Sequence, residues 1–167
     1  EIFGQIGSGA QVRNVTVSGT VKGGNYTAGV VGYNGSGKIV NCTNYCTVTS
    51  SIQYAQNLGG ICGRNNGTIG SCKNYGNISG YAYLGGITGY SGSSIAITSC
   101  ENDGTITAYN PNFGSDGHFG GIAGKGKTIE DSINRGKIVA NQNSNVGGIV
   151  GESDSGYIKS CKNEATV

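Results

Sequence analysis

The sequence LGGICG at residues 58–63 recurs as LGGITG at 84–89, FGGIAG at 119–124 and VGGIVG at 146–151. A looser copy, AGVVG, occupies 28–32, and IFG at 2–4 matches the end of an earlier one. The glycines that close these phrases lie between 26 residues (63 to 89) and 35 residues (89 to 124) apart. Self-similarity with a period in this range indicates a solenoid or another repeat array.

A second, ten-residue phrase of the form I-x-x-C-x-N-x-G-x-I follows each glycine phrase. Its copies are VRNVTVSGTV (12–21), IVNCTNYCTV (39–48), IGSCKNYGNI (69–78), ITSCENDGTI (97–106), IEDSINRGKI (129–138) and IKSCKNEATV (158–167). The first and last apolar residues keep the same separation in every copy, so all variation in length falls between the blocks. Constant blocks joined by variable loops are typical of coils that share one axis.

The composition favours repetitive β-structure over an ordinary globule. The 167 residues include 33 glycines, one proline, no tryptophan and no methionine, and they show no collagen-like period. The apolar residues are mostly isoleucine and valine in short segments without a 3.6-residue period, which indicates strands and not helices. We therefore expect an all-β chain, a parallel β-solenoid and specifically a right-handed β-helix, with six coils of about 26–35 residues.

The chain reads as a single repeat domain, residues 1–167, and as a fragment of a longer chain because it begins within a repeat. The expected repeats are 1–27, 28–57, 58–83, 84–118, 119–145 and 146–167. Stacking turns equivalent positions into ladders along the axis. Four apolar ladders are expected in the core: Val30, Ile61, Ile87, Ile122 and Ile149; Val12, Ile39, Ile69, Ile97, Ile129 and Ile158; Val21, Val48, Ile78, Ile106, Ile138 and Val167; and Leu58, Leu84, Phe119 and Val146.

One column of the second phrase contains an asparagine in five copies: Asn44, Asn74, Asn102, Asn134 and Asn163. Stacked amides can hydrogen-bond along the axis and also bind turn backbone, so we expect an asparagine ladder and not a row of ligand-binding amides. A glycine follows two residues later in three copies (Gly76, Gly104 and Gly136), which favours a tight turn with positive φ.

Four cysteines share another column: Cys42, Cys72, Cys100 and Cys161. The same column holds Val15 and Ser132, so it requires a small side chain and not a metal-binding thiol. No CxxC pair is present to suggest zinc. We expect these cysteines to be buried free thiols, whereas Cys46 and Cys62 lie in other columns and could pair or stay free.

Residues expected on the exterior show matching charges in neighbouring coils. Lys73 should face Glu101, Lys125 should face Glu152, and Glu130 should face Lys159. A further column contains Asp103, Arg135 and Glu164, and Tyr45 should stack on Tyr75. Opposite charges on adjacent strands contribute about 0.2–1 kcal/mol each, so they support the register more than the stability.

The GGIxG phrase and the block that follows it resemble the GLUG-motif repeats of bacterial surface proteins. Such repeats occur in putative adhesins and in the non-catalytic region of IgA1-specific metallopeptidases. The resemblance covers nearly the whole chain and implies a β-solenoid, a secreted or cell-surface location and a role in display or adhesion. It brings no catalytic residue, because the H-E-x-x-H motif of those peptidases is missing and His118 is the only histidine.

The remaining function classes are disfavoured by what the sequence lacks. A glycosidase needs two carboxylates on one face, and the four Asp and five Glu residues align with cations or neutral residues. Threonine pairs such as Thr47/Thr49 and Thr105/Thr107 fit an ice-binding array, but Asn77/Ser79 and Lys137/Val139 interrupt it. We therefore expect no enzyme and no cofactor. A net charge of +2 and the lack of a long apolar run argue against nucleic acid and membrane insertion.

We expect a structural or adhesive solenoid on the bacterial surface or outside the cell, with a host surface protein or a glycan as partner. A module that assembles end to end with copies of itself or with flanking domains is the alternative. The longest connection, residues 107–118, holds the only proline and the only histidine. Its side chains suited to ligand binding are Tyr109, Asn110, Asn112, Phe113, Asp116 and His118. Tyr54, Tyr81 and Tyr83 lie in the equivalent loops of earlier coils and could complete one tyrosine-rich side.

Deletion of residues 109–117 tests this loop as a binding site. Binding to a glycan or a host surface should be lost while the fold survives, because the loop lies outside the constant blocks. Circular dichroism and a cell-surface binding assay measure the two properties. Unaltered binding by the deletion variant would exclude the loop.

Overall fold

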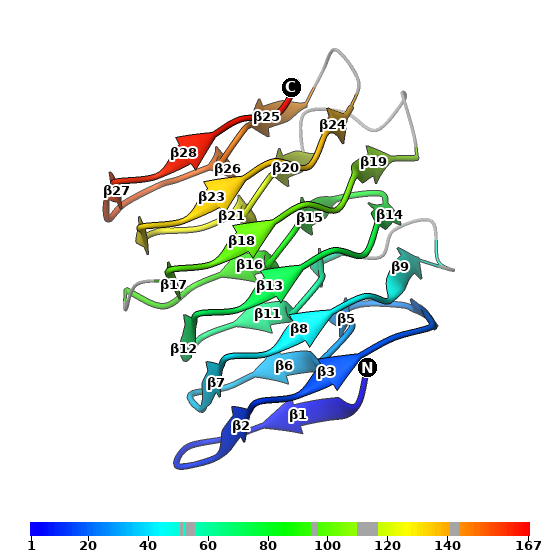
Figure 1. Cartoon of the computed structure of the whole chain (residues 1–167), viewed down its shortest axis with the longest axis vertical. Coiled ribbons are helices and arrows are strands. Elements are labelled where there is room, and N and C mark those ends of the chain that lie inside the picture. The colour runs from blue at the N-terminus through cyan, green and yellow to red at the C-terminus, as the bar shows by residue number, and fades with distance from the viewer. Residues whose placement is uncertain (51, 53–55, 95–96, 110–116, 141–143) are drawn as a thin grey trace.

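A computed structural model of the chain describes residues 1–50, 52, 56–94, 97–109, 117–140 and 144–167. These residues form short parallel strands and no helix, arranged as a β-solenoid (Figure 1). The chain passes through five sheets in a fixed order, here called A to E. Strands five positions apart in the chain therefore become hydrogen-bonded neighbours. The predicted all-β parallel solenoid is confirmed.

Three sheets contain six strands each. Sheet A consists of β1 (Phe3–Ile6), β6 (Val31–Asn34), β11 (Cys62–Asn65), β16 (Thr88–Ser91), β21 (Ala123–Lys125) and β26 (Val150–Glu152). Sheet B consists of β2 (Gln11–Arg13), β7 (Lys38–Val40), β12 (Thr68–Gly70), β17 (Ile97–Thr98), β22 (Ile129–Glu130) and β27 (Ile158–Lys159). Sheet C consists of β3 (Thr16–Val17), β8 (Thr43–Asn44), β13 (Lys73–Asn74), β18 (Glu101–Asn102), β23 (Ile133–Asn134) and β28 (Lys162–Asn163).

The other two sheets contain five strands each. Sheet D consists of β4 (Thr20–Gly23), β9 (Thr47–Ser50), β14 (Ile78–Gly80), β19 (Ile106–Ala108) and β24 (Ile138–Val139). Sheet E consists of β5 (Thr27–Ala28), β10 (Leu58–Gly59), β15 (Tyr83–Gly85), β20 (His118–Gly120) and β25 (Asn145–Gly147). The described chain thus makes five complete turns and part of a sixth, slightly fewer than the six coils predicted.

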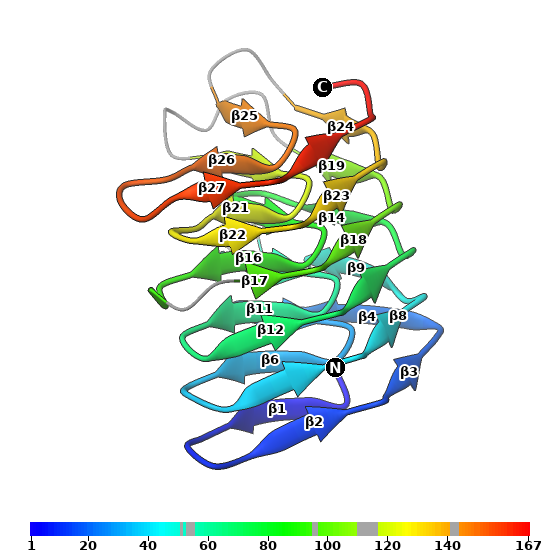
Figure 2. The same ribbon diagram turned by 60° about the vertical axis from the view of Figure 1, so that its left-hand side comes forward.

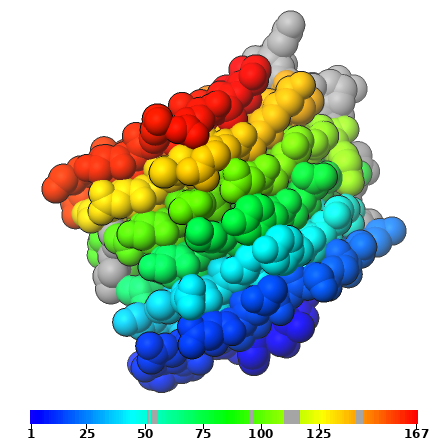
Figure 3. All heavy atoms as spheres, in the orientation of Figure 1, coloured from blue at the N-terminus to red at the C-terminus, as the bar shows by residue number. Residues whose placement is uncertain are grey.

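Each coil is flattened into two layers. Sheets B, C and D follow one another along the near side in Figure 1, and sheets E and A bring the chain back behind them. Figure 2 shows turns that join strands of sheet A to strands of sheet B, such as the turn between β1 and β2. In the space-filling view the coils are successive bands, each in contact with the next (Figure 3). The core is the narrow space between the two layers.

The predicted apolar ladders fill this space, except in the last coil. Ile158 and Val167 were expected in the core but are exposed, because no described coil stacks on them. Ile39 pairs in register with Ile69, which pairs with Ile97, and the ladder continues to Ile129. These four side chains are essentially inaccessible to solvent. The ladders of sheets D and E are also in the expected register. Each fully buried isoleucine contributes roughly 1.5–3 kcal/mol relative to an exposed one, so the ladders supply most of the stabilisation.

The glycines of the GGIxG phrase allow two stretches of backbone to lie against each other. A β-carbon at Gly59 would collide with the carbonyl oxygen of Cys62, within the turn from sheet E to sheet A. A β-carbon at Gly63 would lie 2.5 Å from the carbonyl carbon of Tyr26, where β11 of sheet A passes the segment that enters β5 of sheet E. The equivalent glycines of later coils meet equivalent backbone atoms. Glycine therefore recurs at these positions because very little space remains between these backbones; the largest residue in the column of Gly59 is Ala28.

The middle glycine connects the glycine phrase to the asparagine ladder. Asn44 donates from Nδ2 to Oδ1 of Asn74 at 2.7 Å, and the same bond joins Asn74 to Asn102 and Asn102 to Asn134 at 2.8 Å. These asparagines are fully buried, so the predicted ladder is confirmed. A β-carbon at Gly60 would collide with the Asn74 amide, and one at Gly86 with the Asn102 amide. The two sequence phrases pack on each other within every coil.

The expectation of positive φ at Gly76, Gly104 and Gly136 is wrong. None of these glycines has a left-handed φ. A β-carbon at Gly104 would instead collide with the carbonyl oxygen of Gly76 in the preceding coil. Glycine is therefore needed here because no room is left for a side chain. A left-handed φ occurs instead in another column, at the corner between sheets B and C. Its residues are polar: Asn14, Asn41, Ser71, Ser99, Asp131 and Ser160. Asparagine and aspartate tolerate this conformation because their side chains can bond locally.

Most of the predicted exterior pairs are present. Lys73 lies 3.6 Å from Glu101, and Lys125 lies 2.7 Å from Glu152. Arg135 contacts its column neighbours, Asp103 at 3.8 Å and Glu164 at 3.1 Å. The Tyr45 and Tyr75 rings stack with centroids 5.0 Å apart.

The expected pairing of Glu130 with Lys159 is only half correct. The two residues are in register, but their side chains form no ion pair in the described structure. Glu130 instead accepts a 2.6 Å hydrogen bond from the Tyr157 hydroxyl. Tyr157 directly precedes β27, and its hydroxyl group takes the place of Lys159 at the Glu130 carboxylate.

Substitution of the middle glycine tests the steric explanation. Gly86→Ala should lower the free energy of unfolding by about 3 kcal/mol, because the new methyl group collides with the Asn102 amide and the Gly121 carbonyl. Gly7→Ala is the matched control, since no atom lies within 4 Å of its added β-carbon. Urea unfolding followed by circular dichroism measures both. Equal stability of the two variants would contradict the explanation.

Candidate functional site

The structure describes four of the nine predicted ligand-binding residues. Tyr81 and Tyr109 meet edge to face at the corner between sheets D and E, with ring centroids 5.5 Å apart. Tyr83 stacks on His118 in the next coil, with centroids 4.9 Å apart. The corner therefore brings these four residues together in two pairs. Tyr54, Asn110, Asn112, Phe113 and Asp116 lie outside the described residues.

A larger aromatic surface lies where sheet E packs beside sheet A. We call it the tyrosine strip and define it as Tyr26, Tyr33, Arg64, Tyr83, Tyr90 and His118. Two columns supply these side chains. The column of sheet A contains Tyr33, Arg64 and Tyr90 in register on β6, β11 and β16. The column of sheet E contains Tyr83 and His118 in register on β15 and β20, and Tyr26 directly before β5.

Contacts between the two columns hold the strip together. The Tyr26 ring lies 5.8 Å from the Tyr33 ring, and the Tyr83 ring lies 6.3 Å from the Tyr90 ring. Tyr26 has a left-handed φ of 57°, which is rare for a bulky residue and is imposed by the turn before sheet E. The Tyr33 hydroxyl accepts a hydrogen bond from Asn66 Nδ2 at 3.1 Å. The rings are thus fixed in position by neighbours from different coils.

Arg64 lies in the centre of the strip between two rings. The carbon at the centre of its guanidinium group is 5.0 Å from the Tyr90 centroid and 5.8 Å from the Tyr26 centroid. Nη1 also donates a long, 3.5 Å hydrogen bond to the Tyr26 hydroxyl. Arginine over tyrosine rings gains a cation–π attraction of about 0.5–2 kcal/mol per contact, so the rings hold the guanidinium in place.

A polar cluster closes the strip at its C-terminal end. His118 is nearly buried, and its Nδ1 lies 3.0 Å from Glu152 Oε2 and 3.1 Å from Asn145 Nδ2. A proton on Nδ1 would be donated to the carboxylate, whereas an unprotonated Nδ1 would accept from the amide. Glu152 and Asp154 each lie 2.7 Å from Lys125. The hydrogen bond that Lys125 donates to Asp154 lowers the pKa of this carboxyl group. The charged groups of the cluster therefore neutralise one another.

Half of the strip could have been found in the sequence. Its sheet A column is the residue that follows each closing glycine: Tyr33, Arg64, Tyr90, Lys125 and Glu152. The prediction used only the last two residues of this column, as a charge pair. In the sheet E column, Tyr83 and His118 were predicted as residues suited to ligand binding, and the structure places them on β15 and β20. Tyr26 was not predicted, because its place in the strip depends on how closely sheet E turns back beside sheet A.

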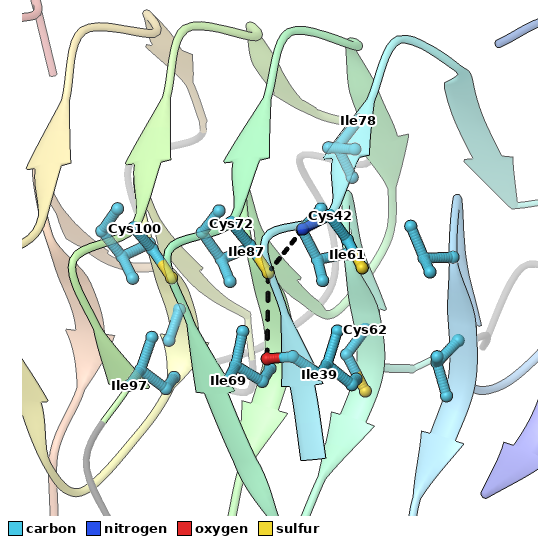
Figure 4. Packing of buried hydrophobic residues seen from close by; sticks show 14 of the residues in the cluster. Ile39, Cys42, Ile61, Cys62, Ile69, Cys72, Ile78, Ile87, Ile97 and Cys100 are labelled. Carbon is cyan, nitrogen blue, oxygen red and sulfur yellow. Dashed lines mark hydrogen bonds between the residues drawn. The ribbon is translucent and has the colours of Figure 1, made fainter. Parts of the chain in front are cut away.

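The thiol column is part of the core and is separate from the strip. All six cysteines are free, and five of them are buried; Cys161, which was also expected to be buried, is half-buried in the last coil. Figure 4 shows Cys42, Cys72 and Cys100 at equivalent positions beside Ile39, Ile69 and Ile97. The backbone N–H of Cys42 donates to Cys72 Sγ at 3.5 Å, and that of Cys100 donates to Ser132 Oγ at 3.1 Å. The column therefore requires a small side chain that can accept this bond, which explains why serine replaces cysteine once.

Their surroundings keep these thiols protonated. The hydrogen bond with the Cys72 thiol, followed by burial, raises the pKa of Cys42 far above its usual range. The hydrogen bond with the Cys100 thiol raises the pKa of Cys72 to about 12. Burial raises the pKa of Cys62 strongly. A thiol is nucleophilic and binds metals as the thiolate, so these residues are inert at neutral pH.

Among the described residues, no group of three or more His, Cys, Asp and Glu side chains is arranged to hold a metal ion. The same residues include no helix long and apolar enough to cross a membrane. The chain matches no protein-family model, and it has no significant match among curated proteins or solved structures. The strip is therefore interpreted from its own geometry.

Alkaline pH should destabilise the solenoid through the thiol column. The native pKa values of Cys42, Cys62 and Cys72 are raised, so their contribution to stability is complete below the unfolded pKa and is lost above it. Above about pH 9 the free energy of unfolding should fall by roughly 1.4 kcal/mol per pH unit for each such thiol.

Urea midpoints between pH 7 and pH 10.5, measured with a reducing agent, check this slope. The urea midpoint of the double variant Cys42→Ser/Cys72→Ser should fall less steeply with pH, because serine fits the column and does not titrate. All other ionisable groups are the same in the two proteins, so their contributions cancel in the comparison. Parallel curves for the two proteins would show that the thiols are not responsible.

Proposed function

We propose that the chain is a non-catalytic binding segment of a secreted or cell-surface protein, and that the solenoid presents the tyrosine strip to a glycan. The observation that carries the proposal is the row of tyrosine rings held by contacts between coils. Tyrosine combines a large apolar face with a polar hydroxyl group and few rotatable bonds, so it binds with little loss of conformational entropy. Rings that are already fixed reduce that loss further.

The strip suits a saccharide better than a compact apolar ligand. Its rings lie along the outer side of the solenoid: Tyr26 is 39% exposed, and Tyr33, Tyr83 and Tyr90 are half-buried. An extended chain of sugar rings can place its C–H faces on such rings while its hydroxyl groups bond to tyrosine hydroxyls and to side chains such as Asn66. A drug-sized apolar molecule would instead require a deep cavity.

Binding without catalysis agrees with the state of the nearby carboxylates. Glu152 and Asp154 are engaged by Lys125 at 2.7 Å, and Glu152 is also 3.0 Å from His118. A general acid in a glycosidase requires a carboxyl group with a raised pKa, whereas the pKa of Asp154 is lowered. The resemblance to GLUG-motif repeats supports a surface location and an adhesive role, with a host surface as the source of the glycan.

Substitution of two strip tyrosines tests the proposal. Tyr33→Ser/Tyr90→Ser should abolish binding to whichever glycans the unaltered chain binds on a glycan and mucin array, because both stacking platforms of sheet A are removed. The solenoid should survive, since polar residues such as Gln5 and Lys125 occupy the same column.

The matched control is Tyr45→Ser/Tyr75→Ser, which removes the exposed stacked pair near sheet C. This variant should bind as the unaltered chain does. Equal loss in both variants, or no glycan bound by the unaltered chain, would refute the proposal.

A further inference from the structure

Arg64 differs from Lys125, the other cation of its column, because it has no acidic partner among the described residues. Lys125 in the same column is held between two carboxylates. Among the described residues, no carboxylate lies within 4.0 Å of the Arg64 guanidinium, although this side chain is partly buried. Its Nε is buried and has no hydrogen-bond partner. A partly buried guanidinium without a counter-ion is a costly arrangement, and an anion that binds there would relieve the cost.

The aromatic neighbours restrict what kind of anion fits. Tyr33 and Tyr90 occupy the strands on either side of Arg64, so the three residues span roughly 10 Å along the axis at the usual strand spacing. This length is comparable to that of a disaccharide. A ligand therefore meets one cation with an aromatic ring on each side. Sugar rings on the tyrosines and one carboxylate on the arginine satisfy all three positions.

A peptide is less well suited to the same surface. Peptides often bind β-proteins by adding a strand to a free edge. β11 already pairs with β6 on one side and with β16 on the other, so its backbone groups are occupied. A peptide could use only side-chain contacts here. The arrangement favours a ligand that binds through flat faces and single charged groups.

We infer that Arg64 is the anion-binding residue of a saccharide site on the tyrosine strip, and that the ligand is a glycan with a carboxylated sugar. This inference rests on the proposed function and adds the ligand class and the residue that selects it. The planar guanidinium donates two parallel hydrogen bonds to a carboxylate, a geometry that lysine does not provide. Tyr26 and Tyr90 hold the guanidinium plane in place for that contact.

Titration of the full 167-residue chain with labelled saccharides tests the inference. The carboxylated probes are tetragalacturonate and sialyllactose, and their neutral counterparts are the methyl ester of the first and lactose. At least one carboxylated probe should bind ten times more tightly than its counterpart. Comparison of the two carboxylated probes identifies a uronic acid or a sialic acid as the source of the charge.

Two variants of Arg64 and one control complete the experiment. Arg64→Gln should weaken binding of the carboxylated probe by roughly 10- to 100-fold and leave the neutral probe unchanged, because a charge-assisted bond is lost. Arg64→Lys keeps the charge and the apolar stem, and it should weaken binding several-fold through loss of the fork. If the glutamine variant does not fold, the affinity of the lysine variant for the carboxylated probe tests the role of Arg64. Arg135→Gln, on the exterior of sheet C, should bind as the unaltered chain does.

The outcomes separate this inference from the proposed function. Equal binding of carboxylated and neutral probes, or unchanged affinity in both Arg64 variants, would overturn the role of Arg64 and leave glycan binding by the strip intact. Binding of a tetraglutamate peptide as tightly as the best saccharide would also overturn it, in favour of an acidic peptide. No binding of any saccharide, here or on the array, would remove the proposed function and the inference together.

Discussion

The close approach of two backbones at the GGIxG phrase is the constraint on which the rest of the structure depends. Sheet E turns directly into sheet A, and the turn leaves no space for a β-carbon at Gly59, Gly60 or Gly63. Because the chain can turn so tightly, each coil stays thin enough for single rows of apolar, cysteine and asparagine side chains to fill the space between its layers. The same closeness brings the outer side chains of sheets E and A together, and so it creates the tyrosine strip.

The ladders explain why a chain with few large apolar residues can still fold. Each asparagine of the ladder satisfies its own turn and the next coil at once: Asn74 donates to Gly76 and to Asn102 and accepts from Gly76 and Asn44. A second ladder at the turn between sheets A and B, Asn34 to Asn65 to Ser91, works in the same way. Buried polar groups are costly unless they are paired, and here the stacking itself pairs them.

The sequence was sufficient for the fold because its constant blocks determine the register. Residues nine apart, such as Ile39 and Val48, occur in every block, so aligning the blocks aligns the strands. The left-handed corner was missed because its residues are Asn, Ser and Asp, whereas the glycines nearby are required for space. Tyr83 and His118 of the strip were predicted, but their partners were missed, because residues such as Tyr26 and Arg64 are 38 residues apart in the chain and meet only through the turn from sheet E.

The stacking of parallel strands also determines how the molecule would respond to force. Each strand is hydrogen-bonded only to the equivalent strands of the neighbouring coils, so no bond of the sheets joins coils that are further apart. Tension applied between the two chain ends would therefore act on the end coils first and peel them from the stack one at a time. Each released coil would lengthen the molecule by a similar step while the remaining coils keep their ladders. The solenoid would in this way lengthen step by step from its ends, while the coils that carry the tyrosine strip stay folded longest.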